Sequence, residues 1–271
     1  MKIKKLIFVV SVFMALSLTA CQGNSADNLS VTQTPAGETP ASTDVAGGKE
    51  TVTMQYAVGD IVFADDTVMK ADHLTEINGE NLPVAVIAGF KDNGAAFGIG
   101  VHRSDAPLQW ASDDTVGYST RFEDTVCTQD AEKEDVFHGD TDGSDNWEAV
   151  CKTDSQGTSD AKENYPAFYF VNTYAEKYAL ADSYASGWYM PDIARLCTVY
   201  KNRKAVNASL KKIYELDSSA AMSGLDTNWY WSSSQAGSED DHAWFVHYFN
   251  GYAGECPKNF DNLHVIAVRD F

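Results

Sequence analysis

Strand-like and helix-like segments follow one another in a definite order over residues 51–271, and this order limits the fold more than any other feature. Strand-like segments, rich in aromatic and β-branched residues and separated by polar turns, lie at both ends of the range. They cover residues 58–64, 84–90, 96–101, 229–233, 243–249 and 264–269. Helix-like segments fill the middle, so the order indicates an α+β fold. We expect the first and last strands to pair, because this pairing closes the domain.

Two or three helices are expected in the middle of the chain. Residues 165–181 place apolar side chains on one helical stripe. Pro191 and Asp192 are the residue types that open a second helix, and Asn207 is a capping residue type for a third. Residues 113–160 show no such periodicity and predict a long irregular insertion.

The first fifty residues have the composition of a targeting segment followed by a tether. Lysines precede an apolar run over residues 7–18, and Leu18-Thr19-Ala20-Cys21 after it resembles a bacterial lipobox. The resemblance implies cleavage before Cys21 and acylation of that cysteine, so residues 1–20 are a predicted lipoprotein signal peptide. Residues 21–50 are small and polar and predict a flexible tether. Because Gln22 is not the aspartate that retains many lipoproteins at the inner membrane, we expect lipid anchoring in the outer membrane with exposure at the cell surface.

The charge of the chain excludes one class of partner. Twenty Lys and Arg residues face 39 Asp and Glu residues, which gives a formal net charge of -19. Nucleic-acid binding needs a basic face for the phosphates, so no nucleic-acid partner is expected. An exported chain also favours cystine formation, and the two cysteines of the insertion, Cys127 and Cys151, predict a disulfide that would close the long loop.

The segment 243–249 has two faces of different character. Strand periodicity places Trp244, Val246 and Tyr248 on one face, which is an ordinary core stripe. The other face carries two aromatic residues and a histidine. Periodicity alone leaves two interpretations of that second face open: an exposed contact surface, or a second buried layer under the following loop of residues 250–263.

Four motifs in the second half of the chain resemble those of one protein family. They are Gly187-Trp188-Tyr189-Met190-Pro191, Tyr230-Trp231-Ser232-Ser233-Ser234-Gln235, Ala243-Trp244-Phe245-Val246 and Ala267-Val268-Arg269. The order is similar to that in C-type lectin-like domains of the formylglycine-generating-enzyme-like branch, and especially to variable lipoproteins of diversity-generating retroelements of the treponemal type. The resemblance covers nearly all of residues 51–271.

The resemblance implies a ligand-binding protein whose site is diversified by mutation of adenines in AAC-type codons. Such codons reach Tyr, His, Phe, Leu, Ile, Asp, Cys and Pro, but never Glu, Lys, Gln, Met or Trp. Within residues 230–271 the candidate variable positions are Phe245, His247, Phe249, Tyr252, Cys256, Pro257, Phe260, Asp261, Leu263, His264 and Ile266. The implied fixed scaffold is Trp231, Trp244, Val246 and Arg269. The implied partner is an unknown protein or glycan, such as one on the surface of another cell.

Other functions of the same fold are less well matched by these residues. Sulfatase-activating oxygenases of this branch use a close cysteine pair, whereas Cys197 and Cys256 lie far apart, so we expect no enzyme activity and no cofactor. Residues 140–145 are acidic but lack the calcium-loop spacing, and they predict a surface turn. The unconnected spacings of His242, His247, His264 and Cys256 do not predict a zinc site. A fixed-specificity adhesin or glycan-binding lipoprotein remains the alternative.

Overall fold

Two five-stranded sheets form the framework of the protein. The computed structural model describes residues 56–225 and 228–271, which belong to one compact unit. The predicted signal peptide, the lipidated Cys21 and the tether over residues 21–50 lie outside the described residues. The first sheet has the strand order β10-β4-β3-β1-β2 and the second the order β6-β5-β7-β8-β9. Every strand pair is antiparallel except β5 with β7.

The strand bounds agree in part with the sequence pattern. The strands are β1 Ile61–Phe63, β2 Val68–Met69, β3 Pro83–Phe90, β4 Ala96–Arg103, β5 Val126–Gln129, β6 Phe137–Gly139, β7 Trp229–Ala236, β8 His242–His247, β9 Tyr252–Pro257 and β10 Ile266–Asp270. The α+β class is therefore confirmed. The predicted pairing of first and last strands is wrong, because β10 pairs with β4 while β1 pairs with β3 and β2. The β3–β4 hairpin carries β4 to the other side of β3, where β10 reaches it.

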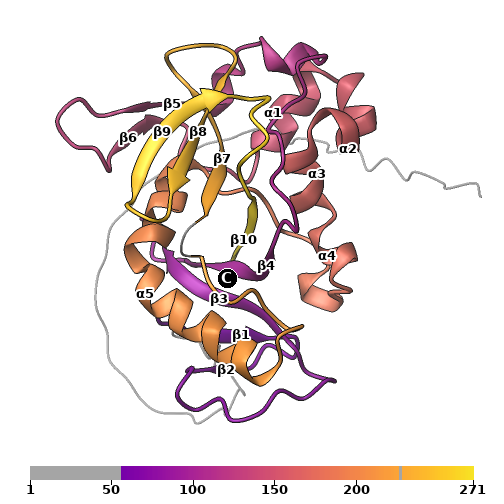
Figure 1. The fold of residues 1–271 in the computed structure, drawn as a ribbon, viewed down its shortest axis with the longest axis vertical. Helices are drawn as coiled ribbons and strands as arrows, with labels where there is room; N and C mark the ends of the chain where they lie inside the picture. The colour runs from indigo at the N-terminus through magenta and orange to yellow at the C-terminus, as the bar shows by residue number, and fades with distance from the viewer. Residues whose placement is uncertain (1–55, 226–227) are drawn as a thin grey trace, which may run out of the picture. The chain divides into compact units, whose positions relative to one another are not determined.

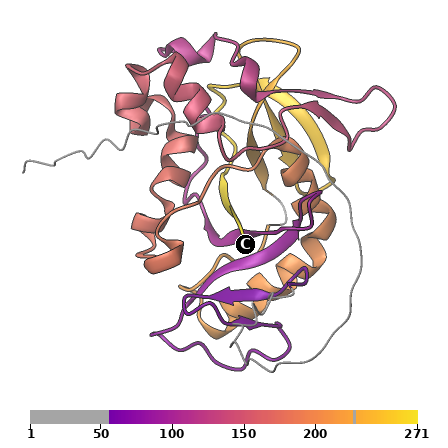
Figure 2. The same ribbon diagram turned by 180° about the vertical axis from the view of Figure 1, so that it is seen from behind.

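Helices cover the strands from two sides, as Figures 1 and 2 show. The helices are α1 Asn146–Thr153, α2 Ala161–Asn164, α3 Pro166–Asn172, α4 Tyr174–Lys177 and α5 Ile193–Leu216, with 3-10 turns η1 Val116–Tyr118, η2 Glu123–Thr125, η3 Gly157–Asp160 and η4 Asp182–Tyr184. Helix α5 packs against β3, β7 and β8. The insertion predicted to be irregular thus contains α1, β5, β6 and three of the 3-10 turns.

Two helix predictions need correction. Asp192 caps α5 as expected, its side chain accepting from the amide of Arg195 at 3.0 Å. Asn207, however, lies inside α5, which continues to Leu216, and its side-chain oxygen accepts from the backbone amide of Leu225 at 2.9 Å. The expected helix over residues 165–181 is divided between α3 and α4 at Thr173, whose backbone leaves helical geometry.

The apolar side chains form two buried clusters. The first lies around α5 and includes Ile193, Val206 and Trp244. The second lies around α1, α3 and α4 and includes Trp110, Phe168 and Trp231. These two clusters separate the thiols that the sequence predicted to pair.

The predicted disulfide between Cys127 and Cys151 is wrong. Both residues are free thiols. Cys127 is buried in the first cluster, and its thiol donates to the carbonyl of Asp140 at 2.5 Å. Cys151 lies half-buried on α1, which packs on the second cluster.

Within residues 56–225 and 228–271, no helix has the length and apolar character required to span a bilayer.

Candidate functional site

Strand β8 separates the core from a surface that carries aromatic side chains. Trp244, Val246 and Tyr248 are buried in the first cluster, which confirms the predicted core stripe. On the opposite face Phe245 is only 5% exposed, so its prediction as an exposed contact is wrong. His247 is half-buried, and Phe249 is 74% exposed. The second face of β8 therefore changes from buried to exposed along its length.

Three strands place a row of rings side by side at the exposed end of this face. Trp229 of β7 is opposite His247 of β8, and His247 is opposite Tyr252 of β9. The ring centroids of Trp229 and His247 are 4.7 Å apart. Trp229 also stacks on Phe245 at 5.2 Å with an interplanar angle of 4°. We call Trp229, Phe245, His247, Phe249 and Tyr252 the aromatic cluster.

The rings beside Phe245 and His247 complete the aromatic cluster. Phe245 meets Tyr252 edge-on at 6.2 Å, and His247 lies 6.0 Å from Phe249. Tyr252 is 60% exposed. Aromatic pairs at these separations attract each other beyond the area they bury. Buried Phe245 and half-buried Trp229 therefore form a base beneath the exposed rings of Phe249 and Tyr252.

Gly251 allows the chain to turn sharply between β8 and β9. Gly251 has φ +79, and a Cβ there would lie 2.2 Å from a ring carbon of Tyr200. Asn250 continues the turn, its amide oxygen accepting from the amide of Tyr252 at 3.1 Å. The turn leads into β9, so the predicted loop over residues 250–263 is wrong in this part. Positive φ at glycine costs little, and this is the signal for a hairpin that sequence reasoning missed.

A buried lysine fixes the far end of β9. The ammonium of Lys258 donates to the carbonyls of Gly117, Thr120 and Asp240 at 2.7, 3.0 and 2.7 Å. It also lies 4.9 Å from the ring centroids of Trp110 and Phe122. Burial lowers the pKa of Lys258 to about 7. This anchor was not predicted, and a lysine in a polar loop gives no sequence signal of burial.

Phe260 and Asp261 follow this anchor and are exposed. They lie beyond the end of β9 opposite to Tyr252, since β9 runs from Tyr252 to Pro257. Pro257 itself is half-buried. Cys256 is half-buried against the second cluster, and burial raises the pKa of its thiol to about 12. The predicted positions are thus divided between the two ends of β9.

Of three further candidates, two are buried and one is half-buried. Leu263 and Ile266 are fully buried, so their prediction as contact residues is wrong. His264 is half-buried, with its Nδ1 3.0 Å from the carbonyl of Ser104, and burial lowers its pKa. The physical reason is that both faces of the final segment are covered. Val265 and Ala267 pack in the second cluster while Ile266 and Val268 pack in the first.

Trp229 is the member of the aromatic cluster that sequence reasoning missed. It was assigned to a strand but not to the site, because its neighbours in space come from β8 and β9. Cross-strand pairing is the relevant signal, since residues opposite each other share a face of the sheet. A register for β7 and β8 would have placed Trp229 beside His247.

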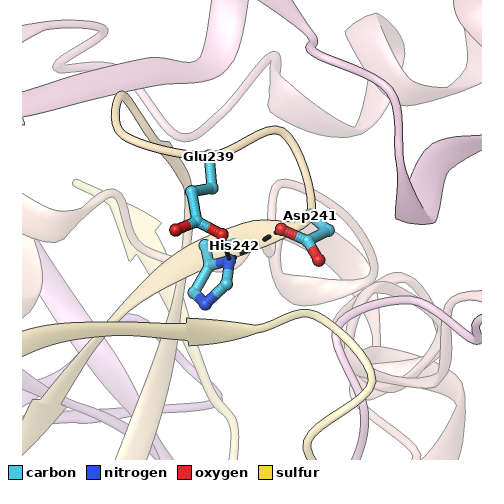
Figure 3. Close-up of side chains that lie close together, drawn as sticks. All are labelled: Glu239, Asp241 and His242. Atoms are coloured by element: carbon cyan, nitrogen blue, oxygen red, sulfur yellow. Dashed lines mark hydrogen bonds and ion pairs between the residues drawn. The ribbon is translucent and has the colours of Figure 1, made fainter.

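The acidic groups of the predicted surface turn over residues 140–145 have partners within the protein. Asp142 pairs with Arg195 at 3.0 Å, and Asp140 accepts from the amide of Asn146 at 2.8 Å. Among the described residues, Glu239, Asp241 and His242 form the one group of His, Cys, Asp and Glu side chains close enough to share a metal ion (Figure 3). His247, His264 and Cys256 do not belong to this group.

Comparison with known proteins gives a fold but no family. No family model matches the chain, and no curated protein matches it. The chain is similar to the crystal structure of a fimbrial protein from Bacteroides ovatus ATCC 8483, with a TM-score of 0.50 and 14% sequence identity. The likeness is one of fold alone. The match covers 79% of this chain and 48% of that chain, so this chain spans about half the length of its structural neighbour.

Proposed function

We propose that this chain is a ligand-binding lipoprotein of the cell surface, with a C-type lectin-like fold and a C-terminal site diversified by a retroelement. The aromatic cluster carries the proposal. It presents the exposed rings of Phe249 and Tyr252 over a buried base. Exposed aromatic side chains supply large contact area at low entropic cost, as they do in antibody paratopes. A rigid strand framework allows such residues to change without loss of the fold.

The distribution of residue types over the site supports diversification. Residue types that adenine mutation of AAC codons cannot produce occur at six positions within residues 230–271. Trp231, Gln235, Trp244 and Lys258 are buried, whereas Glu255 is half-buried and Glu239 is exposed. The exposed positions Phe249, Tyr252, Phe260 and Asp261 are all of types that such codons reach. Most residues of the unreachable types thus lie inside the protein, as a fixed scaffold requires, and Glu239 and Glu255 are fixed positions outside it.

The burial pattern also narrows the proposed variable set. Phe245, Leu263 and Ile266 are buried, and a random change at any of them would create a cavity or an unpaired polar group. We therefore assign ligand contact to His247, Phe249 and Tyr252 at one end of β9, and to Phe260 and Asp261 at the other. The ligand is a protein or a glycan.

Anchoring and surface display are part of the same proposal. The lipobox-like Cys21 supplies the anchor and residues 22–50 the tether, which would hold the domain away from an outer membrane. The structural neighbour is described as a fimbrial protein, and a surface-associated role for this chain agrees with that description. Protease treatment of intact cells tests display: loss of the protein supports it, and full protection contradicts it.

The DNA beside the gene tests diversification directly. We expect a near-copy of the 3′ end that differs mainly at adenines, together with a reverse transcriptase gene. Among isolates, codons 247, 249, 252, 260 and 261 should vary while codons 231, 244 and 258 stay constant. Equal variation at both sets, or a constant 3′ end with no near-copy, would contradict diversification and favour an adhesin of fixed specificity.

A further inference from the structure

The turn between β7 and β8 directs three ligating side chains toward one point (Figure 3). Nδ1 of His242 lies 2.7 Å from a carboxylate oxygen of Asp241 and 3.4 Å from a carboxylate oxygen of Glu239. The ligating atoms of the three residues all lie within 4.8 Å of one another. Glu239 is exposed, while Asp241 and His242 are half-buried. A nitrogen and two carboxylate oxygens therefore converge at an accessible position.

Buried groups hold the backbone of this turn in place. The carbonyl of Asp240 accepts from the ammonium of Lys258 and from the side-chain amide of Gln235, both at 2.7 Å. The carbonyl of Asp241 accepts from the amide of Lys258 at 2.7 Å. Lys258 and Gln235 are both buried. The backbone that carries the three ligating side chains is thus fixed from inside the protein.

The guanidinium of Arg121 pairs with carboxylates other than the two ligating ones. Arg121 lies 3.0 Å from a carboxylate oxygen of Asp240 and 3.4 Å from a carboxylate oxygen of Glu123. Within the part of the chain that the structure describes, His242 is the ion-pair partner of both Glu239 and Asp241. The two carboxylates therefore share one imidazole as ion-pair partner, and Asp241 also interacts electrostatically with the buried ammonium of Lys258. The exposed carboxylate of Glu239 still carries negative charge that a cation can balance.

We propose that Glu239, Asp241 and His242 bind one divalent transition-metal ion of the Zn²⁺ type, independently of the proposed ligand-binding role. Ligands about 2.0–2.1 Å from a tetrahedral zinc lie about 3.3 Å apart, so the 3.4 Å separation already fits. The 2.7 Å distance between Nδ1 of His242 and the carboxylate oxygen of Asp241 lengthens when the metal ion takes the place of the proton on Nδ1. That proton passes to Nε2 or to solvent. Three protein ligands leave the fourth position to water or to a further ligand.

The donor set selects the class of metal. Calcium and magnesium take oxygen ligands, whereas an imidazole nitrogen with carboxylates suits zinc and its neighbours in the first transition row. His138 provides a matched comparison, because its Nε2 lies 2.9 Å from a carboxylate oxygen of Asp130 and forms no second ion pair with the residues that the structure describes. One carboxylate and one imidazole on the surface form an ordinary ion pair, so His138 serves as the control.

Calorimetric titration of the full-length protein with Zn²⁺ tests the proposal. We expect one Zn²⁺ per chain, with affinity reduced at least about tenfold in His242→Ala and in Glu239→Gln, since even outer partners of a metal site are worth about 10–100-fold. His138→Ala should leave affinity unchanged. Glu239 is exposed, so Glu239→Gln tests the site even if His242→Ala does not fold, and circular dichroism checks folding of each variant.

Three results would overturn the proposal. These are failure of the parent protein to bind Zn²⁺ at millimolar concentration, unchanged affinity in a folded Glu239→Gln variant, and an affinity for Ca²⁺ equal to that for Zn²⁺. Cobalt offers a second measurement, because Co²⁺ in a nitrogen- and oxygen-ligated site absorbs visible light. The Co²⁺ spectrum should disappear in Glu239→Gln and persist in His138→Ala.

Discussion

Replacing Phe245 and Phe249 one at a time with serine separates the base of the aromatic cluster from its contact surface. The two residues lie on the same face of the chain near the end of β8, yet their exposed fractions are 5% and 74%. Phe245 stacks on Trp229 and touches Tyr252, so serine would leave a cavity between two aromatic rings. Phe249 has its ring near His247 and otherwise faces solvent.

The magnitudes follow from burial. Truncating a buried phenylalanine costs about 3–5 kcal/mol in the free energy of unfolding, and losing its aromatic pairs adds about 0.5–1.5 kcal/mol. We therefore expect Phe245→Ser to destabilise the protein by about 4 kcal/mol or more. Phe249→Ser should change stability by no more than about 0.5 kcal/mol, as surface substitutions usually do.

Urea unfolding followed by tryptophan fluorescence measures both values, since Trp229 reports directly on the ring beside it. Tyr252→Ser, which also removes an exposed ring, is the matched control for Phe249→Ser. A loss below about 1 kcal/mol for Phe245→Ser would refute the assignment of Phe245 to the core. A loss above about 2 kcal/mol for Phe249→Ser would refute its assignment to the surface.

Three further predictions concern the framework. Burial lowers the pKa of Lys258 from 10.5 to about 7, so the folded state binds fewer protons than the unfolded state between these two pH values. The free energy of unfolding should therefore rise by about 1.5 kcal/mol from about pH 7 to 8.5. Urea unfolding of Lys258→Met should not show this rise. Cys127 and Cys151 should both react with a thiol reagent after unfolding without reductant, whereas a disulfide would block them. Gly251→Ala should lower the melting temperature far more than Gly94→Ala. The two glycines have similar φ values of +79 and +84, but the added Cβ would lie 2.2 Å from Tyr200 at position 251 and in open space at position 94. Equal shifts in melting temperature would contradict this packing.

Much of the fold could be predicted from local pattern. Alternation along residues 243–249 correctly placed Trp244, Val246 and Tyr248 in the core, because side chains of a strand point to opposite faces. Asp192 was correctly assigned to the start of a helix, since its side chain satisfies a free backbone amide there. These features depend on neighbours within a few residues, which the sequence contains.

The site could be predicted only in part. Phe249 and Tyr252 are exposed as a contact surface requires, but Phe245 on the same strand face is buried. Alternation reports which residues share a face and does not report what covers that face. Here the segment containing Leu263 and Val265 covers one end of it and leaves the other end open, as their burial in the cluster around Trp231 shows.

The sequence by itself therefore determined the α+β class, the core stripe of β8 and the positions of β1, β3, β4, β7, β8 and β10. Only the tertiary structure decided which face is covered, that Lys258 is buried, that Cys127 and Cys151 are apart, and that Trp229 joins His247. The physical reason is the range of the interactions. Periodicity and capping act within one element, whereas burial and cross-strand contacts depend on segments distant in sequence, such as β7 and β9 on either side of β8.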